Sequence, residues 1–391
     1  MNRTRKLAVG LGVAVGLVTI GSAALAAEEK PAEAARPVVQ IALLLDTSNS
    51  MDGLITQAKS QLWKIVNEFV TAERGGQRPE FQVALYEYGN NGLPAAQGYI
   101  RQVLPLTTDL DKVSQELFAL KTNGGDEFCG QVIKVATEAL NWSKSNEDLK
   151  VIYIAGNEPF TQGPVDYHVA CKAAATKGIM VNTIHCGLDR EGIDTGWRDG
   201  ALLADGKYMN IDQNQRVVHI EAPQDAEIAH LGTELNGTYI AYGPQGGSGR
   251  ESQTRQDANA ASMEQGAAVQ RAITKSSALY QNASWDLVDA VNSGKVKAQE
   301  VDSKQLPEAM QKMNPQERAA HIQKMTEQRK AIQSKIQKLN QERDQYVAEK
   351  QKAMAQTSQP STLDAAIIKT VHEQAAARHF VFKASATGPA H

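Results

Sequence analysis

A short run of oxygen-bearing side chains follows an aliphatic segment near the start of the chain. The segment Leu43–Leu45 leads directly into Asp46, and Ser48 and Ser50 follow at alternate positions. This alternation places the three side-chain oxygens on one side of the predicted loop. One carboxylate and two hydroxyls suit a hard cation such as Mg²⁺, which prefers oxygen ligands and retains several waters. The competing interpretation is that one of these side chains caps the helix that follows.

A buried strand must hold this run in place, and the surrounding pattern predicts one. Short β-rich segments alternate with helical segments from residue 38 to about residue 243. The predicted strands are Val39–Asp46, Phe81–Tyr88, Tyr99–Leu104, Val151–Ala155, Met180–Cys186 and Tyr239–Tyr242. The predicted helices are Gly53–Glu73, Leu110–Leu120, Gly130–Ser143, Val165–Lys177 and Asp225–Leu235.

The fold class that this pattern predicts is α/β, with a doubly wound, mainly parallel sheet and helices on both faces. Continuously apolar strands separated by helices are typical of such sheets. Ligands of open parallel sheets bind at the carboxyl ends of the strands. Asp46 lies at that end of the first predicted strand.

The Asp-Thr-Ser-Asn-Ser segment after a buried strand resembles the Asp-x-Ser-x-Ser motif of von Willebrand factor type A domains. The resemblance covers residues 38–243, and the order of the predicted elements matches. In that family the motif, a Thr from a second loop and an Asp from a third loop form a metal-ion-dependent adhesion site. A carboxylate of the partner occupies the last position on the metal.

The second loop, Thr122–Gly130, departs from the family pattern. Gly124 and Gly125 match the family's Gly-Gly, but Asp126 or Glu127 stands where Thr is usual, depending on how the turn is aligned. The resemblance implies that Asp126 binds the metal or one of its waters.

The third loop, Ile154–Phe160, departs as well. The family's Asp is replaced by Asn157 on one alignment and by Gly156 on the other, and Glu158 follows one or two positions later. An amide oxygen is an acceptable ligand for a hard cation, and Glu158 offers a compensating charge.

The resemblance therefore implies a binding module without enzymatic activity. A divalent cation, most simply Mg²⁺, would capture an acidic group on a protein partner. The implied metal ligands are Asp46, Ser48, Ser50, Asp126 and Asn157, supported by Glu127 and Glu158. One alternative is a metal-independent structural module of the cell envelope, in which Asn157 hydrogen-bonds the serine hydroxyls. The other is an enzyme of unknown class, although no P-loop, dinucleotide fingerprint or nucleophile elbow is present and no catalytic residue is predicted.

Composition limits the other classes of function. The chain has 391 residues, 42% of them hydrophobic, and a net charge of −3, which permits one large domain and an accessory region. A near-neutral charge and only 5% aromatic residues argue against a nucleic-acid-binding protein.

The N-terminus has the pattern of a signal peptide at residues 1–26. Arg3, Arg5 and Lys6 precede the apolar run Leu7–Ile20, and Ala24-Leu-Ala26 fits the small-residue cleavage rule. An uncleaved membrane anchor is the alternative. We expect cleavage after residue 26, a linker at residues 27–37, and a periplasmic or secreted protein with no stable membrane span.

The C-terminal part changes in composition. Residues 244–262, rich in Gly, Ser and polar residues, are predicted to be a linker, and residues 263–391 a helical region. A long helix is predicted at about 315–354, and a short one at 362–371. The apolar stripe of the long helix includes Arg329 and Arg343. It indicates either a solvated helix or hairpin, or a coiled coil that oligomerises the chain.

Two further features leave alternatives open. Cys129 and Cys186 are placed on the same rim of the sheet, where they form a disulfide or remain packed as free thiols. The polar region 187–221 is either a surface insertion or a recognition loop that uses Trp197 and Tyr208 as anchors for a partner.

Overall fold

The structure is a computed structural model that describes residues 36–212, 214, 219–263, 265–354 and 363–382. The predicted signal peptide and nearly all of the predicted linker at residues 27–37 lie outside the described residues. No helix of the described part is long and apolar enough to cross a membrane.

A six-stranded sheet forms the centre of the α/β part, with strand order β4-β3-β1-β5-β6-β7. β4 runs antiparallel to β3, and the other pairs are parallel, as predicted for a mainly parallel sheet. The strands are β1 (Val38–Asp46), β3 (Glu80–Tyr88), β4 (Ile100–Thr107), β5 (Leu149–Gly156), β6 (Met180–Cys186) and β7 (Tyr208–Ile211).

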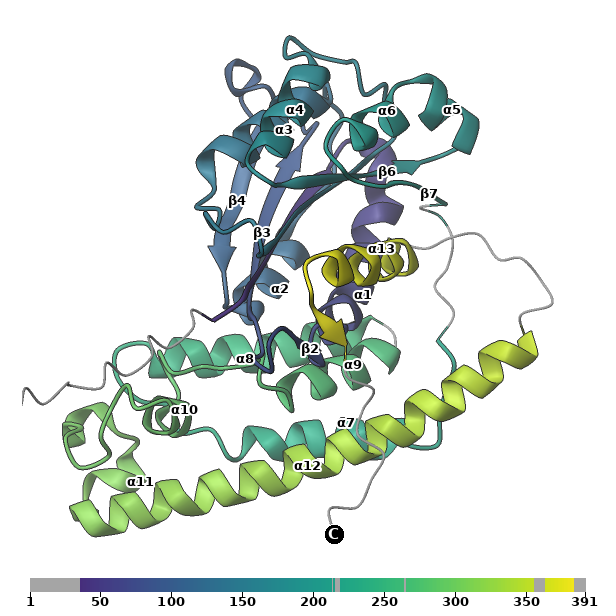
Figure 1. Cartoon of the computed structure of the whole chain (residues 1–391). Helices are drawn as coiled ribbons and strands as arrows, with labels where there is room; N and C mark the ends of the chain where they lie inside the picture. Colours follow the sequence, from purple (N-terminus) through teal and green to yellow (C-terminus); the bar gives the residue numbers. More distant parts are fainter. Residues whose placement is uncertain (1–35, 213, 215–218, 264, 355–362, 383–391) are drawn as a thin grey trace, which may run out of the picture. The chain divides into compact units, whose positions relative to one another are not determined.

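Helices cover both faces of this sheet (Figure 1). β1 lies in the middle, and its side chains alternate between two hydrophobic clusters, one on each face. One cluster includes α1 (Asp52–Asn67) and α2 (Leu110–Ala119), and the other includes α3 (Cys129–Ala139) and α4 (Tyr167–Thr176). Two short helices, α5 (Asp189–Asp194) and α6 (Trp197–Leu202), precede the edge strand β7. The doubly wound α/β class is thus confirmed.

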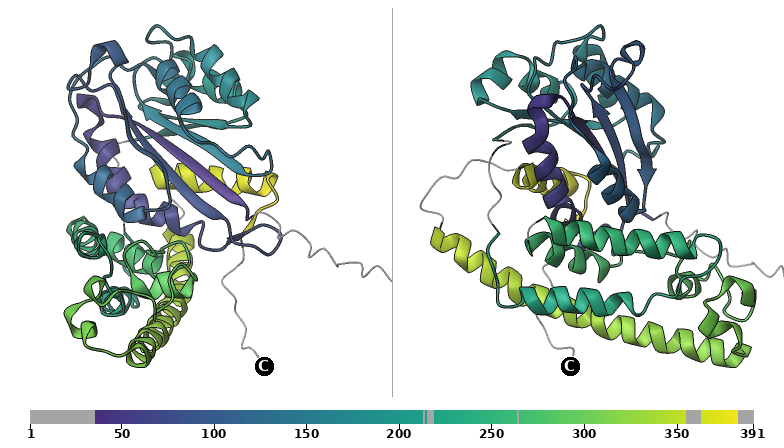
Figure 2. Two further views of the ribbon diagram at one scale, coloured as in Figure 1. Left: turned by 90° about the vertical axis from the view of Figure 1, so that its left-hand side faces the viewer. Right: turned by 180° about the vertical axis from the view of Figure 1, so that it is seen from behind.

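A helix from the end of the described chain completes the first of these faces. α13 (Leu363–Ala377) lies beside α1 (Figure 2), and its Leu363, Ile367 and Val371 belong to the same cluster as α1 and β1. The amides of Gln374 and Asn182 exchange two buried hydrogen bonds, which set the position of α13 on β6. A short antiparallel pair, β2 (Ala72–Glu73) with β8 (Val381–Phe382), follows.

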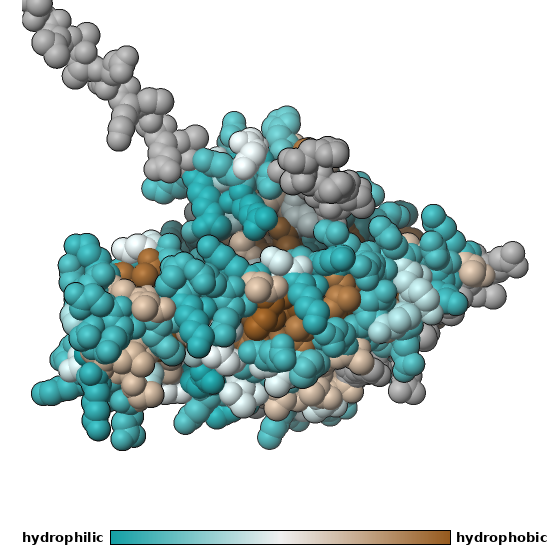
Figure 3. Space-filling view, turned by 90° about the horizontal axis from the view of Figure 1, so that it is seen from below, coloured by the Kyte–Doolittle hydropathy of each residue, from teal (hydrophilic) through white to brown (hydrophobic). Residues whose placement is uncertain are grey.

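The remaining helices form a second part between β7 and α13. They are α7 (Asp225–Asn236), α8 (Gly246–Ser262), α9 (Gln265–Lys275), α10 (Leu287–Asn292), α11 (Glu308–Gln311) and α12 (Pro315–Met354). α12 has the predicted bounds, with Pro315 at its first position. The face of the molecule on which α12 lies is mostly hydrophilic, with small hydrophobic patches (Figure 3).

The structure divides the chain differently from the predicted domains. Residues 239–242 are not a strand of the sheet, since Ala241 makes only an isolated bridge with Asp286. α7 packs on α9 and α12 instead of on the sheet. The α/β part therefore comprises residues 36–212 together with 363–382, and the helical part is inserted between them.

The predicted linker at residues 244–262 is wrong, because helix α8 spans most of it. α8 lacks an aliphatic stripe: Gln253 and Gln256 are buried on its inner face with Ala260. Gly249 allows close contact, because a Cβ there would collide with the Trp285 ring. Glutamine and glycine are also common in linkers, so a helix that buries glutamine side chains and a glycine has the same composition as a linker. This similarity explains the error.

The mixed stripe of α12 packs within the same chain, against α7, α9 and α10. Ile322 and Ile336 are buried there. Arg329 pairs with Asp286 and Asp289, and Arg343 pairs with Asp225. The two basic residues therefore stabilise an intramolecular seam.

Candidate metal and partner-binding site

The Asp-x-Ser-x-Ser segment forms a tight turn at the carboxyl end of β1. Asp46 is completely buried and Ser48 is 3% exposed, whereas Ser50 is exposed. The Ser48 backbone N–H donates to Asp46 Oδ1 at 2.7 Å, and the two serine hydroxyls lie 3.1 Å apart. Ser48 precedes the short 3-10 helix η1 (Asn49–Met51), but its side chain makes no capping hydrogen bond. The Ser48 side chain therefore does not cap the helix.

The second loop directs Glu127 inward and leaves Asp126 exposed. Glu127 is 4% exposed, and its backbone N–H donates to Gln162 Oε1 at 2.7 Å. Asp46 and Asp126 are among the charges that raise the pKa of Glu127, so all three carboxylates are neighbours. The carboxylate that accompanies Asp46 in the interior of the site is therefore Glu127.

The third loop contributes Asn157 and Glu158. Ser50 Oγ donates to Asn157 Oδ1 at 3.4 Å, and the Asn157 carbonyl lies 3.3 Å from His185 Nε2. Glu158 is exposed, but its backbone carbonyl accepts a hydrogen bond of 2.9 Å from Trp197 Nε1. The structure thus brings the predicted residues of all three loops together.

Two glycines make room for the buried carboxylates. Gly89 has a φ of +79°, and a Cβ there would lie 2.6 Å from Glu127 Cγ and 2.9 Å from Asp46 Oδ1. A Cβ at Gly156 would lie 3.1 Å from Asp46 Oδ2. Sequence reasoning missed the role of Gly89. The available signal was a glycine directly after β3, at the same rim as Asp46.

Burial and mutual repulsion dominate the electrostatics of the site. Burial raises the pKa of Asp46 to about 7. Hydrogen bonds from Ser48 lower this pKa by a smaller amount, and the nearby Glu158 charge raises it further. Burial and the Asp46 charge together raise the pKa of Glu127 to about 8. Neither carboxylate forms an ion pair with a basic side chain of the described residues.

Each of the two carboxylates also has an orphan oxygen. Asp46 Oδ2 and Glu127 Oε2 are buried and have no hydrogen-bond partner. Buried polar atoms are nearly always satisfied, so these two atoms point to a missing donor or cation. Within the described ranges no three His, Cys, Asp or Glu side chains converge as metal ligands. A cation here depends on the hydroxyl and amide oxygens as well, and hard cations accept such a mixed oxygen set.

A comparison with known protein families matches residues 40–195 to the von Willebrand factor type A domain. Those residues are a von Willebrand factor type A (VWA) domain. VWA domains commonly mediate protein–protein interaction or adhesion and are generally not enzymes. A search of curated protein sequences gave no match.

Solved structures similar to part of this chain include the following three. One is the conserved hypothetical protein BatB from Bacteroides thetaiotaomicron, with 20% identity, a TM-score of 0.34, and coverage of 44% of this chain and 90% of that chain. The SpRpn10 VWA domain has 18% identity, a TM-score of 0.34, and coverage of 46% and 90%. An aerotolerance-related membrane protein from Bacteroides fragilis has 19% identity, a TM-score of 0.32, and coverage of 45% and 93%.

Neither of the two predicted partner anchors, Trp197 and Tyr208, is exposed. Trp197 is completely buried, where it packs on Phe160 and His185. Tyr208 is half-buried, and its hydroxyl donates to the Asp189 carbonyl at 3.0 Å. The prediction that Trp197 anchors a partner is therefore wrong, because its indole N–H is used to hold the third loop.

The three cysteines of the VWA domain are free and buried. Cys129 and Cys186 therefore do not form the disulfide that was one of the alternatives. Cys129 Sγ lies 3.8 Å from the Tyr88 hydroxyl, beneath the buried carboxylates. Burial raises the pKa of both thiols, so they are packed neutral groups.

Proposed function

We propose that this chain is a binding module whose VWA domain uses a divalent cation, most simply Mg²⁺, to bind a protein partner. The observation that carries the proposal is the pair of buried carboxylate oxygens, on Asp46 and Glu127, that have no partner. A cation held by both carboxylates would satisfy both atoms and offset the burial and the repulsion that raise the pKa of Glu127.

Each residue of the site has a role in this proposal. Asp46 and Glu127 supply the negative charge, and the hydroxyls of Ser48 and Ser50 supply neutral oxygens. Asn157 Oδ1 lies next to Ser50 and supplies a further oxygen, directly or through a water. When bound, the cation supplies an electrophilic position for an oxygen of the partner.

The exposed carboxylates are assigned to the edge of this site. Asp126 and Glu158 are both exposed, and we assign them to waters of the cation or to the partner.

The metal-independent module remains the second candidate, and one contact favours it. Ser50 Oγ donates to Asn157 Oδ1, so the Ser50 hydroxyl proton has an acceptor without a cation. In that case a proton shared by Asp46 and Glu127 replaces the cation. The two candidates differ only in whether a cation binds.

Calorimetric titration of the protein with Mg²⁺, Mn²⁺ and Ca²⁺, together with thermal unfolding, decides between the two. We expect binding heat and a higher midpoint for at least one cation, and loss of both effects in Asp46→Asn. Glu300→Gln changes an exposed carboxylate of the helical part, outside the VWA domain and its three loops, and is the matched control. The metal-dependent proposal fails if the wild-type protein gives no heat and no shift with any of the three.

Export and oligomerisation are further parts of the proposal that need their own tests. We propose that residues 1–26 direct export to the periplasm or medium. N-terminal sequencing of the mature protein should then begin at Ala27. Oligomerisation through the C-terminal helix stays a prediction, and it would have to use the face of α12 that points away from α7 and α9. Sedimentation equilibrium measures it.

A further inference from the structure

A cavity of about 320 Å³ lies between the VWA domain and the helical part, enclosed by α1, α9, α12 and residues 219–220. That volume is at the lower end of the range of small-molecule sites, which is roughly 300–1,000 Å³. The α1 residues that line it come from the second half of that helix, whereas the Asp-x-Ser-x-Ser turn precedes the first residue of α1. The cavity is therefore separate from the proposed cation site.

The most buried charged side chain that lines this cavity is Arg343 of α12, which is 8% exposed. Its Nε donates to Asp225 Oδ1 at 2.7 Å, and Asp225 Oδ2 lies 2.8 Å from His219 Nε2. A Cβ at Gly266 would collide with the His219 ring, so the glycine leaves room for the imidazole. Asp225 is not itself part of the cavity wall, and it holds the guanidinium by one edge only.

The two terminal nitrogens of Arg343 remain available to a ligand. Within the described residues, their only hydrogen bond or ion pair is a contact of 3.9 Å between Nη1 and Asp344 Oδ1, which is longer than a hydrogen bond. The free N–H groups of a guanidinium form a planar fork that matches the two oxygens of a carboxylate. Lys64, which pairs with Asp364 at 2.7 Å, also lines the cavity and adds a second positive charge. This part of the wall therefore suits a carboxylate.

Two carboxylates line the same cavity. Glu68, at the end of α1, and Asp344 of α12 are 28% and 58% exposed. Glu68 lies 2.9 Å from His372 Nε2, whereas Asp344 Oδ2 accepts a hydrogen bond of 3.1 Å from the neutral Asn340 amide. Burial raises the pKa of Asp344, Arg343 lowers it and the Glu68 charge raises it, in agreement with a position between the two. This part of the wall therefore suits an ammonium group.

A ligand with one kind of charge would be repelled by half of these groups. An anion beside Arg343 would lie near the two carboxylates, and a simple cation beside Asp344 would lie near the guanidinium. A zwitterion presents the matching charge to each. Much of the remaining wall consists of amide side chains, among them Gln270 of α9 and Gln337 of α12, which can hydrogen-bond a polar, uncharged group.

We propose that this cavity binds a free amino acid with a polar, uncharged side chain, whose carboxylate pairs with Arg343 and whose ammonium group pairs with Asp344 and Glu68. The side chain of the ligand would lie among the amides of α9 and α12. The ligand would contact both α1 and α12, so its binding would join the VWA domain to the helical part. The chain would then have a second binding site, one that takes a small molecule and uses no cation.

Isothermal titration calorimetry of the whole protein with L-glutamine, L-asparagine and L-serine tests this inference. The buffer contains EDTA, so that a cation at the VWA site does not contribute. We expect at least one of the three to bind saturably. The N-acetyl and the amide derivatives of the tightest one each keep a single charge, so each should bind at least about tenfold more weakly. The inference is overturned if none of the three binds, or if either derivative binds as tightly as its parent.

Asp344→Asn tests the ammonium end of the site. It keeps the shape of a largely exposed side chain, so the fold should be unaffected, and binding should weaken by about tenfold or more. The matched control is Glu327→Gln, which changes an exposed carboxylate of α12 outside the cavity wall and should keep the affinity within about twofold. An unchanged affinity in Asp344→Asn would overturn the inference.

Arg343→Lys tests the carboxylate end. It keeps a positive charge beside Asp225 and removes the fork, so the amino acid should bind at least about tenfold more weakly. A thermal midpoint measured in parallel shows that the variant is folded. Folded Arg343→Lys with the affinity of the wild type would also overturn the inference, and Asp344→Asn decides the matter independently if Arg343→Lys does not fold.

Discussion

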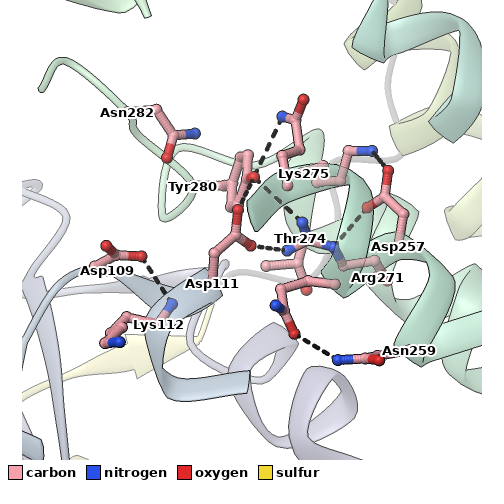
Figure 4. A network of polar contacts seen from close by, with 12 residues as sticks. Asp109, Asp111, Lys112, Asp257, Asn259, Arg271, Thr274, Lys275, Tyr280 and Asn282 are labelled. Atoms are coloured by element: carbon pink, nitrogen blue, oxygen red, sulfur yellow. Dashed lines mark hydrogen bonds and ion pairs between the residues drawn. The ribbon is translucent and has the colours of Figure 1, made fainter. Parts of the chain in front are cut away.

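A buried network of charges joins the helical part to the VWA domain, and one substitution in it gives a sharp prediction (Figure 4). Arg271 of α9 pairs with Asp111 of α2 at 2.6 Å and with Asp257 of α8 at 2.9 Å. Tyr280 donates to Asp111 at 2.6 Å, and Lys275 pairs with Asp257 at 2.8 Å. The two acids balance the two bases, so the network is neutral as a whole.

Asp111→Asn keeps the shape of the side chain and removes one charge. The Asp111 and Arg271 side chains are only 5% and 2% exposed, so solvent cannot replace the missing charge. Asp257 would then face both Arg271 and Lys275 alone. Breaking a buried ion pair from one side costs about 3–5 kcal/mol, because it leaves an uncompensated buried charge. We therefore expect Asp111→Asn to lower the free energy of unfolding by about 3–5 kcal/mol.

Urea denaturation followed by tryptophan fluorescence measures this loss. Arg271 Cζ lies over the Trp63 ring, 4.4 Å from the ring centroid. The fluorescence of Trp63 therefore reports on the network directly. The control is Glu138→Ala, which breaks an exposed pair with Lys134 and should cost about 0.2–1 kcal/mol. The double variant Asp111→Leu/Arg271→Met should be less destabilised than Asp111→Asn. The reasoning is refuted if Asp111→Asn costs no more than Glu138→Ala.

Three further predictions concern the site, the pH dependence and the closing helix. Gly89→Ala should abolish cation binding in calorimetry, because the new Cβ would collide with the buried carboxylates. Gly75 also has a positive φ, but it is surrounded by open space, so the control Gly75→Ala should bind normally. Equal binding by the two variants would contradict this prediction. Burial lowers the pKa of Lys275 to about 8, so the unfolded chain binds more protons above that pH. The wild type should therefore gain stability relative to Lys275→Met as the pH rises from about 8 to 10. The prediction is wrong if the unfolding free energies of the two proteins, measured in urea, change with pH in the same way. Gln374→Leu leaves the buried Asn182 Nδ2 group without its acceptor and should lower the unfolding free energy by about 1–3 kcal/mol in the same assay. An unchanged midpoint would show that this amide pair does not position α13.

The elements with a strong local pattern were predicted closely. β6 has the predicted bounds, and β1 differs from its predicted bounds by one residue. A continuous apolar run between two turns is typical of a strand in a sheet that is covered on both faces, so the run itself marks the ends of the strand. α12 also has the predicted bounds, since Pro315 begins it and no glycine or proline interrupts it. The position of Asp46 at the carboxyl end of β1 followed from the same pattern.

Segments whose environment comes from distant residues were not predicted. α8 resembles a linker in composition because its buried face includes the amides of Gln253 and Gln256, and Gln253 donates to the Tyr280 hydroxyl of a distant segment. Trp197 looked like a surface anchor because a lone aromatic in a polar stretch gives no periodicity that reveals its burial. α13 closes the sheet from the far end of the chain, and local pattern carries no information on such a long-range contact.

The sequence by itself therefore determined the α/β class, the central strand and the three loops that carry the site. Only the tertiary structure decided which side chains point inward. In the second loop, Asp126 and Glu127 are adjacent and chemically alike, and an irregular turn has no period from which to tell them apart. The space beside Gly89 and the hydrogen bond from Gln162 turn Glu127 to the interior. The charge in the interior of the site depends on that choice, because water screens an exposed carboxylate and does not screen a buried one.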